Sequence, residues 1–248
     1  MKTARSVRPA TVGFRRRRVG ERERVAENCR IGRVERLENR NEKEGEKMPS
    51  NQVLIVVARP EAEKSFNGAI VQAAADALTA RGYTPVVSDL YAENFDPVMT
   101  LAEVNEPVEK ADADIQARIQ AVKESVGLIF VHPNWWGGPP AILKGWLDRV
   151  LRNGFAYGFT ADGPWQGLTD KTVQVFSTSN TPRDVELNVY GDPLENFWKT
   201  IVFGLTGAKS FERRNFEQII LSDEAQRAAW LAEVGEIVAR RFPKVKVD

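Results

Sequence analysis

The sequence predicts an α/β protein built on a doubly wound, five-stranded parallel sheet with helices on both faces. Strand-like and helix-like segments alternate five times between residues 53 and 241. The first strand segment, residues 53–58 (VLIVVA), is apolar throughout, as is typical of a strand buried on both faces. Loops rich in Gly, Pro, Trp, Ser and Asn follow three of the strand segments. Open sheets of this kind bind their ligands at that end of the strands.

Each strand is expected where a short run of β-branched or other apolar residues occurs. These runs cover residues 53–58, 84–90, 127–131, 172–177 and 211–219. Each helix is expected where apolar residues recur at intervals of three and four positions. That spacing covers residues 67–81, 112–122, 141–152, 193–205 and 223–241. Ser65 is expected to cap the first helix, and Gly82 is expected to end it. Residues 89–109 are expected to form a loop, and residues 153–170 a Gly- and aromatic-rich excursion.

The chain divides by composition near Met48. Residues 1–47 hold 15 Lys and Arg against eight Glu and no Asp, a net charge of +7, whereas residues 48–248 carry −6. The basic segment is predicted to be disordered, because it cannot bury enough apolar area to offset the entropy of ordering it. Its four consecutive arginines leave an RNA- or membrane-binding arm open. We expect instead that Met48 is the true start, that the segment is dispensable, and that the protein has no nucleic-acid partner.

The scarcity of Cys and His excludes several kinds of site. The single cysteine, Cys29, lies in the basic segment, so residues 48–248 cannot form a disulfide, a Cys-based zinc site or an iron–sulfur cluster. The single histidine is His132, so a Ser-His-Asp triad could be built only around it. No metal is expected. No apolar run approaches the length of a membrane span, which predicts a cytoplasmic domain without an integral membrane segment.

The loop after the third strand segment, HPNWWGGPP from His132 to Pro140, is the most informative part of the chain. The prolines stiffen the backbone, and the glycines let another group approach closely. The indoles of Trp135 and Trp136 offer flat apolar surface. The loop therefore suits a flat ring system, although a hydrophobic plug between helices is the alternative.

The loop after the first strand segment, RPEAEKSFN from Arg59 to Asn67, has neither of the usual dinucleotide and NTP fingerprints. It does place Ser65 and Asn67 at a helix N-terminus. Free backbone N–H groups, the helix dipole and the cations Arg59 and Lys64 predict a phosphate-binding site there. The alternative is an ordinary N-cap at Ser65.

The loop after the fourth strand segment, residues 177–192, carries hydroxyl and amide groups that can bind the polar edge of a ring. Tyr190 and Asp192 could be catalytic or could cap the next helix. Together the three loops provide a phosphate site, a flat apolar surface and a polar rim. A flavin needs these three features.

On these residues the chain resembles the flavodoxin-like NAD(P)H:quinone oxidoreductase family, in its DT-diaphorase-like branch. The resemblance covers residues 51–242 and rests on six short motifs that occur in the family's order. The motifs are SFN (65–67), SDLYAENFDP (88–97), the P-x-x-W loop (133–136), PAILKGWLDRV (140–150), GFAY (154–157) and YGDP (190–193). The resemblance implies that residues 48–248 form one flavodoxin-like flavin-binding domain with strand order 2-1-3-4-5.

The resemblance also implies which residues serve the flavin. The SFN motif matches the residues that hold the phosphate region, the Trp loop matches the backbone that meets the ring, and residues 178–180 fall at the pyrimidine edge. The implied cofactor-binding residues are Arg59, Ser65, Phe66, Asn67, Pro133, Asn134, Trp135, Trp136, Gly137, Thr178, Ser179 and Asn180. Tyr190, where relatives often have His, and Tyr157 are predicted to be catalytic.

The chain departs from the family's pattern at four places. Arg59 replaces a His that commonly opens the first loop. Gly137 stands where an aromatic residue often walls the quinone pocket, which predicts a roomier pocket. The family's Thr-Gly-Gly stretch is not kept at residues 178–180. Tyr190 in place of His puts the family's proton relay in doubt.

The resemblance implies an enzyme that passes a hydride from NAD(P)H through FAD, or FMN, to a quinone by ping-pong exchange at one site. It also implies a homodimer. One alternative is a reductase of nitro or azo compounds, and another is a regulatory flavoprotein subunit of a membrane ion-efflux system. A flavodoxin-type electron carrier is disfavoured, because the insertions at 153–170 and 181–195 would cover the flavin.

Overall fold

The computed structural model of the protein describes residues 51–245. The prediction that residues 1–47 form a disordered, dispensable extension falls outside the described residues. Within the described part, no helix is both long enough and apolar enough to cross a membrane.

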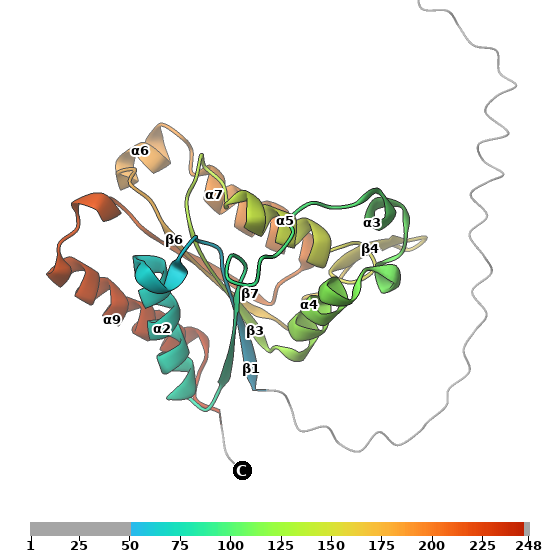
Figure 1. Ribbon diagram of the computed structural model, residues 1–248, viewed down its shortest axis with the longest axis horizontal. Coiled ribbons are helices and arrows are strands. Elements are labelled where there is room, and N and C mark those ends of the chain that lie inside the picture. The colour runs from blue at the N-terminus through green and yellow to red at the C-terminus, as the bar shows by residue number, and fades with distance from the viewer. Residues whose placement is uncertain (1–50, 246–248) are drawn as a thin grey trace, which may run out of the picture. The chain divides into compact units, whose positions relative to one another are not determined.

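A five-stranded parallel sheet forms the centre of the described region (Figure 1). Its strands run in the spatial order β2-β1-β3-β6-β7, which confirms the predicted 2-1-3-4-5 pattern once the small β4–β5 hairpin is set aside. The pairings align Leu54 with Val86 and with Leu128, so apolar side chains form rows across the sheet. The strands are β1 (Gln52–Val57), β2 (Thr84–Asp89), β3 (Gly127–Pro133), β6 (Thr172–Thr178) and β7 (Ser210–Phe216).

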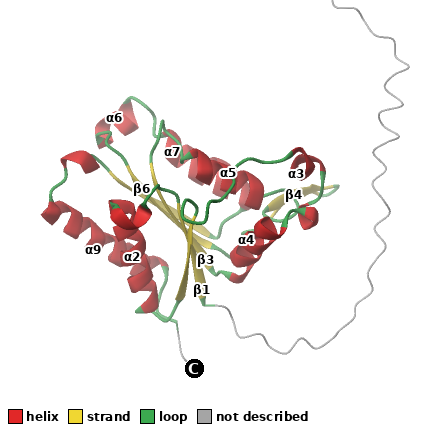
Figure 2. Ribbon diagram, viewed as in Figure 1, coloured by secondary structure: helices red, strands yellow, loops and turns green. Residues whose placement is uncertain are grey.

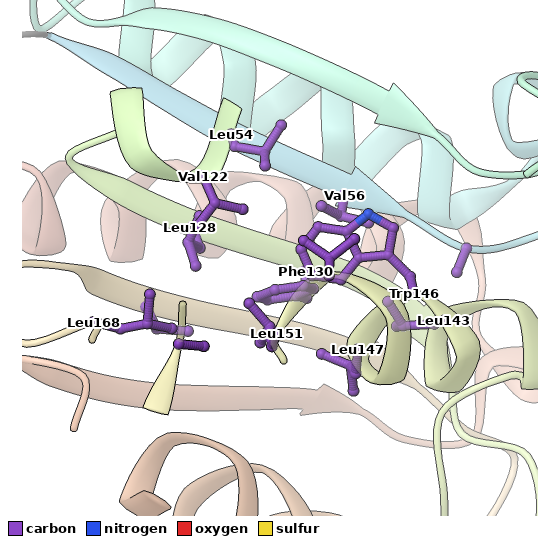
Figure 3. Close-up of a cluster of buried hydrophobic side chains, with 14 of the residues drawn as sticks. Leu54, Val56, Val122, Leu128, Phe130, Leu143, Trp146, Leu147, Leu151 and Leu168 are labelled. Atoms are coloured by element: carbon purple, nitrogen blue, oxygen red, sulfur yellow. The ribbon is translucent and has the colours of Figure 1, made fainter. Parts of the chain in front are cut away.

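Helices cover both faces of this sheet (Figure 2). Helices α2 (Phe66–Thr79) and α9 (Glu224–Arg241) pack on one face, because Ile70 and Val234 share a buried cluster with Ile55. Helices α4 (Ala113–Glu124) and α5 (Ala141–Val150) pack on the other face, against a cluster built on Leu54, Val56 and Phe130 (Figure 3). Alternate residues of β1 therefore enter different cores, as the continuous apolar run predicted.

The predicted elements are confirmed with small shifts at their ends, but several short elements were missed. The expected loop 89–109 contains helix α3 (Leu101–Asn105), which begins at a capping box of Thr100 and Glu103. The excursion contains an antiparallel hairpin of β4 (Tyr157–Thr160) and β5 (Gly163–Gln166). A further helix, α6 (Arg183–Asn188), lies in the third loop.

The predicted helix 193–205 is helical but not uniform. It comprises α7 (Pro193–Glu195), a π-helical segment (Asn196–Val202) and α8 (Phe203–Thr206). π-helical turns are uncommon and occur frequently at functional sites. The side chain of Trp198, inside this segment, is fully buried against Phe130 and Phe203.

Candidate functional site

Two neighbouring cavities open where the predicted loops meet, at the carboxyl ends of β1, β3 and β6. The first, of about 260 Å³, is called the ring cavity here, and the second, of about 510 Å³, the acceptor cavity. Asn134 lines both, so the two are adjacent. The ring cavity is lined by Arg59, Phe66, Asn67, Pro133, Asn134, Trp135, Thr178, Ser179, Asn180 and Ile219. The acceptor cavity is lined by Asn134, Trp136, Gly137, Thr181, Glu186, Tyr190 and Pro193.

The first loop presents the N-terminus of α2 to the ring cavity. Ser65 caps the helix, since its Oγ accepts a hydrogen bond from the Gly68 amide at 3.2 Å and donates to the Ala62 carbonyl at 2.7 Å. Its hydroxyl is thus used inside the protein, and Ser65 does not line either cavity. The backbone N–H groups of Phe66 and Asn67 have no acceptor among the described residues. They are free to donate to an anion, as the first N–H groups of a helix commonly do.

The two predicted cations differ in position. Arg59 lines the ring cavity, and its Nη1 donates to the carbonyls of Pro60 and Glu61 at 3.0 and 3.4 Å. Lys64 instead pairs with Glu61 at 3.1 Å and does not reach the cavity. Arg59 is therefore the cation of this loop that can meet a bound phosphate.

Two amide side chains, the buried Asn67 and the half-buried Asn134, line the ring cavity, and each has one buried polar atom without a partner. Asn67 accepts from the Thr178 hydroxyl at 3.2 Å through Oδ1, while its Nδ2 has no acceptor. Asn134 donates to Glu186 at 3.1 Å through Nδ2, while its Oδ1 has no donor. Buried polar atoms are rarely left unpaired, and a ligand in the ring cavity could supply partners for both of these. One free donor, one free acceptor and two free backbone N–H groups fit a flavin, whose ring edge and phosphate carry matching groups.

The two tryptophans occupy a tight turn and face outward. Trp135 and Gly138 exchange backbone hydrogen bonds of 3.0 and 3.1 Å, and both central residues are left-handed, with φ of 57° at Trp136 and 74° at Gly137. This is the backbone of a type I′ turn, which Asn and Gly usually form. The side chain of Trp135 is 45% exposed and that of Trp136 is fully exposed. The alternative of a hydrophobic plug is therefore wrong, and a strained turn displaying indoles is typical of a binding site.

Gly137 is required by space as well as by conformation. A Cβ atom at this position would lie 2.8 Å from Cγ of Pro193. The aromatic side chain that relatives often carry here could not be accommodated without moving Pro193. The acceptor cavity is bounded instead by Gly137 and Pro193.

The polar side chains of the third loop differ in whether they remain free for a ligand. The Ser179 hydroxyl accepts from Asn215 at 3.1 Å, and Asn180 accepts from the Ile220 amide at 3.0 Å through Oδ1. Both residues line the ring cavity, but these side-chain atoms are already used within the protein. Thr178, whose hydroxyl holds Asn67, positions the free amide donor described above.

Tyr190 and Asp192 have different roles. Asp192 is a helix cap, because its Oδ1 accepts from the Glu195 amide at 3.1 Å. Tyr190 lines the acceptor cavity and is 59% exposed, so its hydroxyl can reach a ligand there. Tyr157 lies elsewhere, in a separate cavity of about 330 Å³ with Leu147 and Phe197. Within one chain the two predicted catalytic tyrosines are not brought together.

His132 is a structural residue and not part of a triad. Its ring is fully buried, its Nδ1 lies 2.8 Å from the Pro133 carbonyl, and its Nε2 accepts from the Trp198 indole at 3.1 Å. Because Nε2 accepts, the proton of the neutral ring is on Nδ1. Burial is the main cause that lowers the pKa of His132 to about 4; the Pro133 carbonyl opposes this shift, and the charge of Arg213 adds to it. The neutral ring thus joins the π-helical segment to the strand end that carries the ring cavity.

The sequence did not identify four residues that line the cavities. They are Thr181, Glu186, Pro193 and Ile219. Glu186 belongs to α6, a helix too short to show an apolar period, so no pattern marked which of its side chains turns inward. Within residues 51–245, no group of three or more His, Cys, Asp or Glu side chains is placed to hold a metal ion.

Comparisons with known proteins agree with this arrangement. The chain matches a family model described as a flavodoxin-like fold over residues 51–238. It is 37% identical over 161 residues to NAD(P)H dehydrogenase (quinone) 1 of Cavia porcellus, across 56% of this chain and 58% of that protein. The chain thus spans less than two thirds of that relative's length.

A second relative is covered almost completely. The chain is 37% identical over 218 residues to ribosyldihydronicotinamide dehydrogenase (quinone) of Mus musculus, across 73% of this chain and 91% of that protein. The solved structure of an NAD(P)H:quinone oxidoreductase from Methanothermobacter marburgensis has the same fold, with a TM-score of 0.68 at 24% identity over 76% of this chain and 98% of that one. The chain therefore belongs to the flavodoxin-like family of NAD(P)H:quinone oxidoreductases.

Proposed function

We propose that the protein is a flavin-dependent oxidoreductase that moves a hydride from NAD(P)H to a quinone, with the two substrates using one site in turn. The observation that carries this proposal is that Asn67 and Asn134, each with one unpaired amide atom, both line the ring cavity. They lie between a helix N-terminus suited to phosphate and a turn that displays two indoles. When bound, the flavin would supply the two-electron chemistry.

The residues of this chain would bind and orient the reactants. Arg59 and the N–H groups of Phe66 and Asn67 would hold the phosphate region. Trp136 and Tyr190 would flank a flat substrate in the acceptor cavity, placing one ring against another for transfer. FAD and FMN both carry the groups that these residues address, so the mass of the released cofactor decides between them.

Steady-state kinetics test the proposal. Flavin-loaded protein should oxidise one equivalent of NADH or NADPH per flavin without a quinone and should turn over only when a quinone is present. Double-reciprocal plots at several quinone concentrations should be parallel, as for ping-pong exchange. Flavin-loaded protein that reduces no quinone with either nucleotide would contradict the proposed activity while leaving the cofactor site intact.

Replacing Tyr190 with Phe is expected to lower kcat for quinone reduction about 10-fold, because it removes one hydrogen-bond donor from the acceptor cavity where charge develops on oxygen. Flavin content should not change, since Tyr190 lines the acceptor cavity and not the ring cavity. Stopped-flow rates of the two half-reactions would locate the loss in the quinone step. An unchanged kcat and kcat/KM in a stable Tyr190→Phe protein would mean that Tyr190 only packs against Pro193.

We also propose that the protein is a homodimer. Apolar side chains are exposed on α3, at Leu101 and Val104, and on the helical segment 196–206, at Ile201 and Leu205. A second copy would cover such side chains and would bring its Tyr157 excursion to the acceptor cavity. Light scattering should give twice the chain mass at micromolar concentration, and a monomer there would overturn this proposal. The expected cytoplasmic location stays a prediction for cell fractionation.

A further inference from the structure

Glu186 places a carboxylate in the wall of the acceptor cavity. The side chain is only 4% exposed, and its Oε1 accepts the Asn134 amide at 3.1 Å. Its second oxygen, Oε2, accepts no hydrogen bond from any described residue. Acidic side chains are rarely this little exposed without an ion-pair partner, which makes this position unusual for a residue without a role.

Among the described residues, no arginine or lysine forms an ion pair with this carboxylate. Behind the acceptor cavity lies a polar cavity of about 300 Å³ that Glu186 also lines. Three arginines line the polar cavity, and each is paired with another acid. Arg213 pairs with Asp192 and Glu195, Arg183 with Glu217, and Arg214 with Glu217 and Glu233.

The other described residues of the acceptor cavity carry no charge. They are the amide of Asn134, the hydroxyl of Thr181, the phenol of Tyr190, the indole of Trp136, and the uncharged residues Gly137 and Pro193. A substrate that fills the cavity displaces water, and the field of an unpaired charge then acts on it at low dielectric. The sign of the charge on the acceptor should therefore alter its binding.

We propose that Glu186 sets the charge selectivity of the acceptor cavity, so that neutral and cationic flat-ring acceptors are favoured and anionic ones are rejected. The inference rests on the proposed function and names the class of acceptor. The reacting nicotinamide ring of NAD(P)H is uncharged before transfer and cationic afterwards, so its entry is compatible with the same carboxylate. Only substituents that bring negative charge into the cavity are opposed.

The test uses the flavin-loaded full-length protein and three acceptors on one ring system. They are 1,4-naphthoquinone, its 2-sulfonate and a derivative bearing a trimethylammonium group. The measured quantities are the ratios of kcat/KM for the sulfonate and for the ammonium compound to that for the neutral quinone. The three acceptors differ in intrinsic reduction potential. Wild type and variants are tested with the same compounds, so these differences cancel when the ratios of the proteins are compared.

Glu186→Gln keeps the shape and an acceptor for Asn134 while it removes the charge. It should raise the sulfonate-to-neutral ratio about 10-fold and lower the ammonium-to-neutral ratio by a similar factor. Asp184→Asn is the matched control, since Asp184 is an exposed acid on the same helix that lines neither cavity. Water and salt screen its charge, so neither ratio should change by more than about twofold.

Ratios that are the same in Glu186→Gln and wild type would overturn the inference. A wild-type holoprotein that reduces none of the three quinones would contradict the proposed function instead. In that case calorimetric titration of the same three compounds decides the inference, because the carboxylate acts on binding. A sulfonate-to-neutral ratio of dissociation constants that falls in Glu186→Gln supports it, and an unchanged ratio rejects it.

Discussion

Replacing Arg149 with Leu should lower the free energy of unfolding by about 3–5 kcal/mol, the usual cost of breaking a buried ion pair. Arg149, on α5, is buried and donates to Glu103 at 2.9 Å, to Asp112 at 2.8 Å and to the Asp96 carbonyl at 2.7 Å. Glu103 is buried as well, so the variant leaves an uncompensated carboxylate in the interior. The same contacts hold residues 96–112 against helix α5.

Denaturant unfolding of matched variants checks this expectation. Lys144→Leu removes an ion pair on the same helix, but Lys144 and Asp148 are about half exposed, so the loss should stay below about 1 kcal/mol. The double variant Arg149→Leu with Glu103→Leu should lose less than Arg149→Leu alone, because no buried charge is left unpaired. A loss in Arg149→Leu no larger than that in Lys144→Leu would show that the buried pair does not stabilise the fold.

Between pH 7 and about 4, His132 alone should lower the free energy of unfolding by about 3 kcal/mol. Its pKa falls from the ordinary 6.5 to about 4 in the folded protein. Below pH 6.5 the unfolded chain therefore takes up a proton that the folded chain refuses, and stability declines until the folded pKa is reached. The physical cause is burial of the ring, whose two nitrogens are held by Pro133 and Trp198.

His132→Gln isolates this effect, because Gln keeps a donor and an acceptor but does not titrate. Unfolding is measured for both proteins at pH 7, 5.5 and 4.5. The carboxylates contribute equally to both curves, so the wild type should lose stability more steeply than His132→Gln over this range. Parallel curves would mean that folding does not lower the pKa of His132.

The sheet was predictable because its signals are local. Apolar runs such as residues 53–57 must be buried on both faces, and one strand of this kind after another leaves few alternatives to a doubly wound sheet. The Ser65 cap was also predictable, because Ser commonly caps a helix. The loop that carries the two tryptophans was predictable from its prolines and glycines. Asn67, which the SFN motif marked, lines the ring cavity.

The remainder depends on contacts between distant residues. Helix α3 is five residues long and is held by Arg149, 46 positions beyond Glu103, so no periodicity predicts it. The hydrogen bond from Asn215 of β7 to the Ser179 hydroxyl, just beyond β6, engages a hydroxyl that the sequence offered to a ligand. Glu186 turned inward only because its short helix packs beside Asn134. Sequence patterns indicate which face of a long helix or strand is buried, but they do not predict contacts of this kind between distant residues.

The absorption spectrum of the purified full-length protein, before and after titration with FAD and with FMN, tests directly whether the ring cavity holds a flavin. We expect a yellow protein that holds about one flavin per chain, because Asn67 and Asn134, each with a free amide atom, line one cavity at the carboxyl ends of the strands. A colourless protein that binds neither added FAD nor added FMN would contradict it.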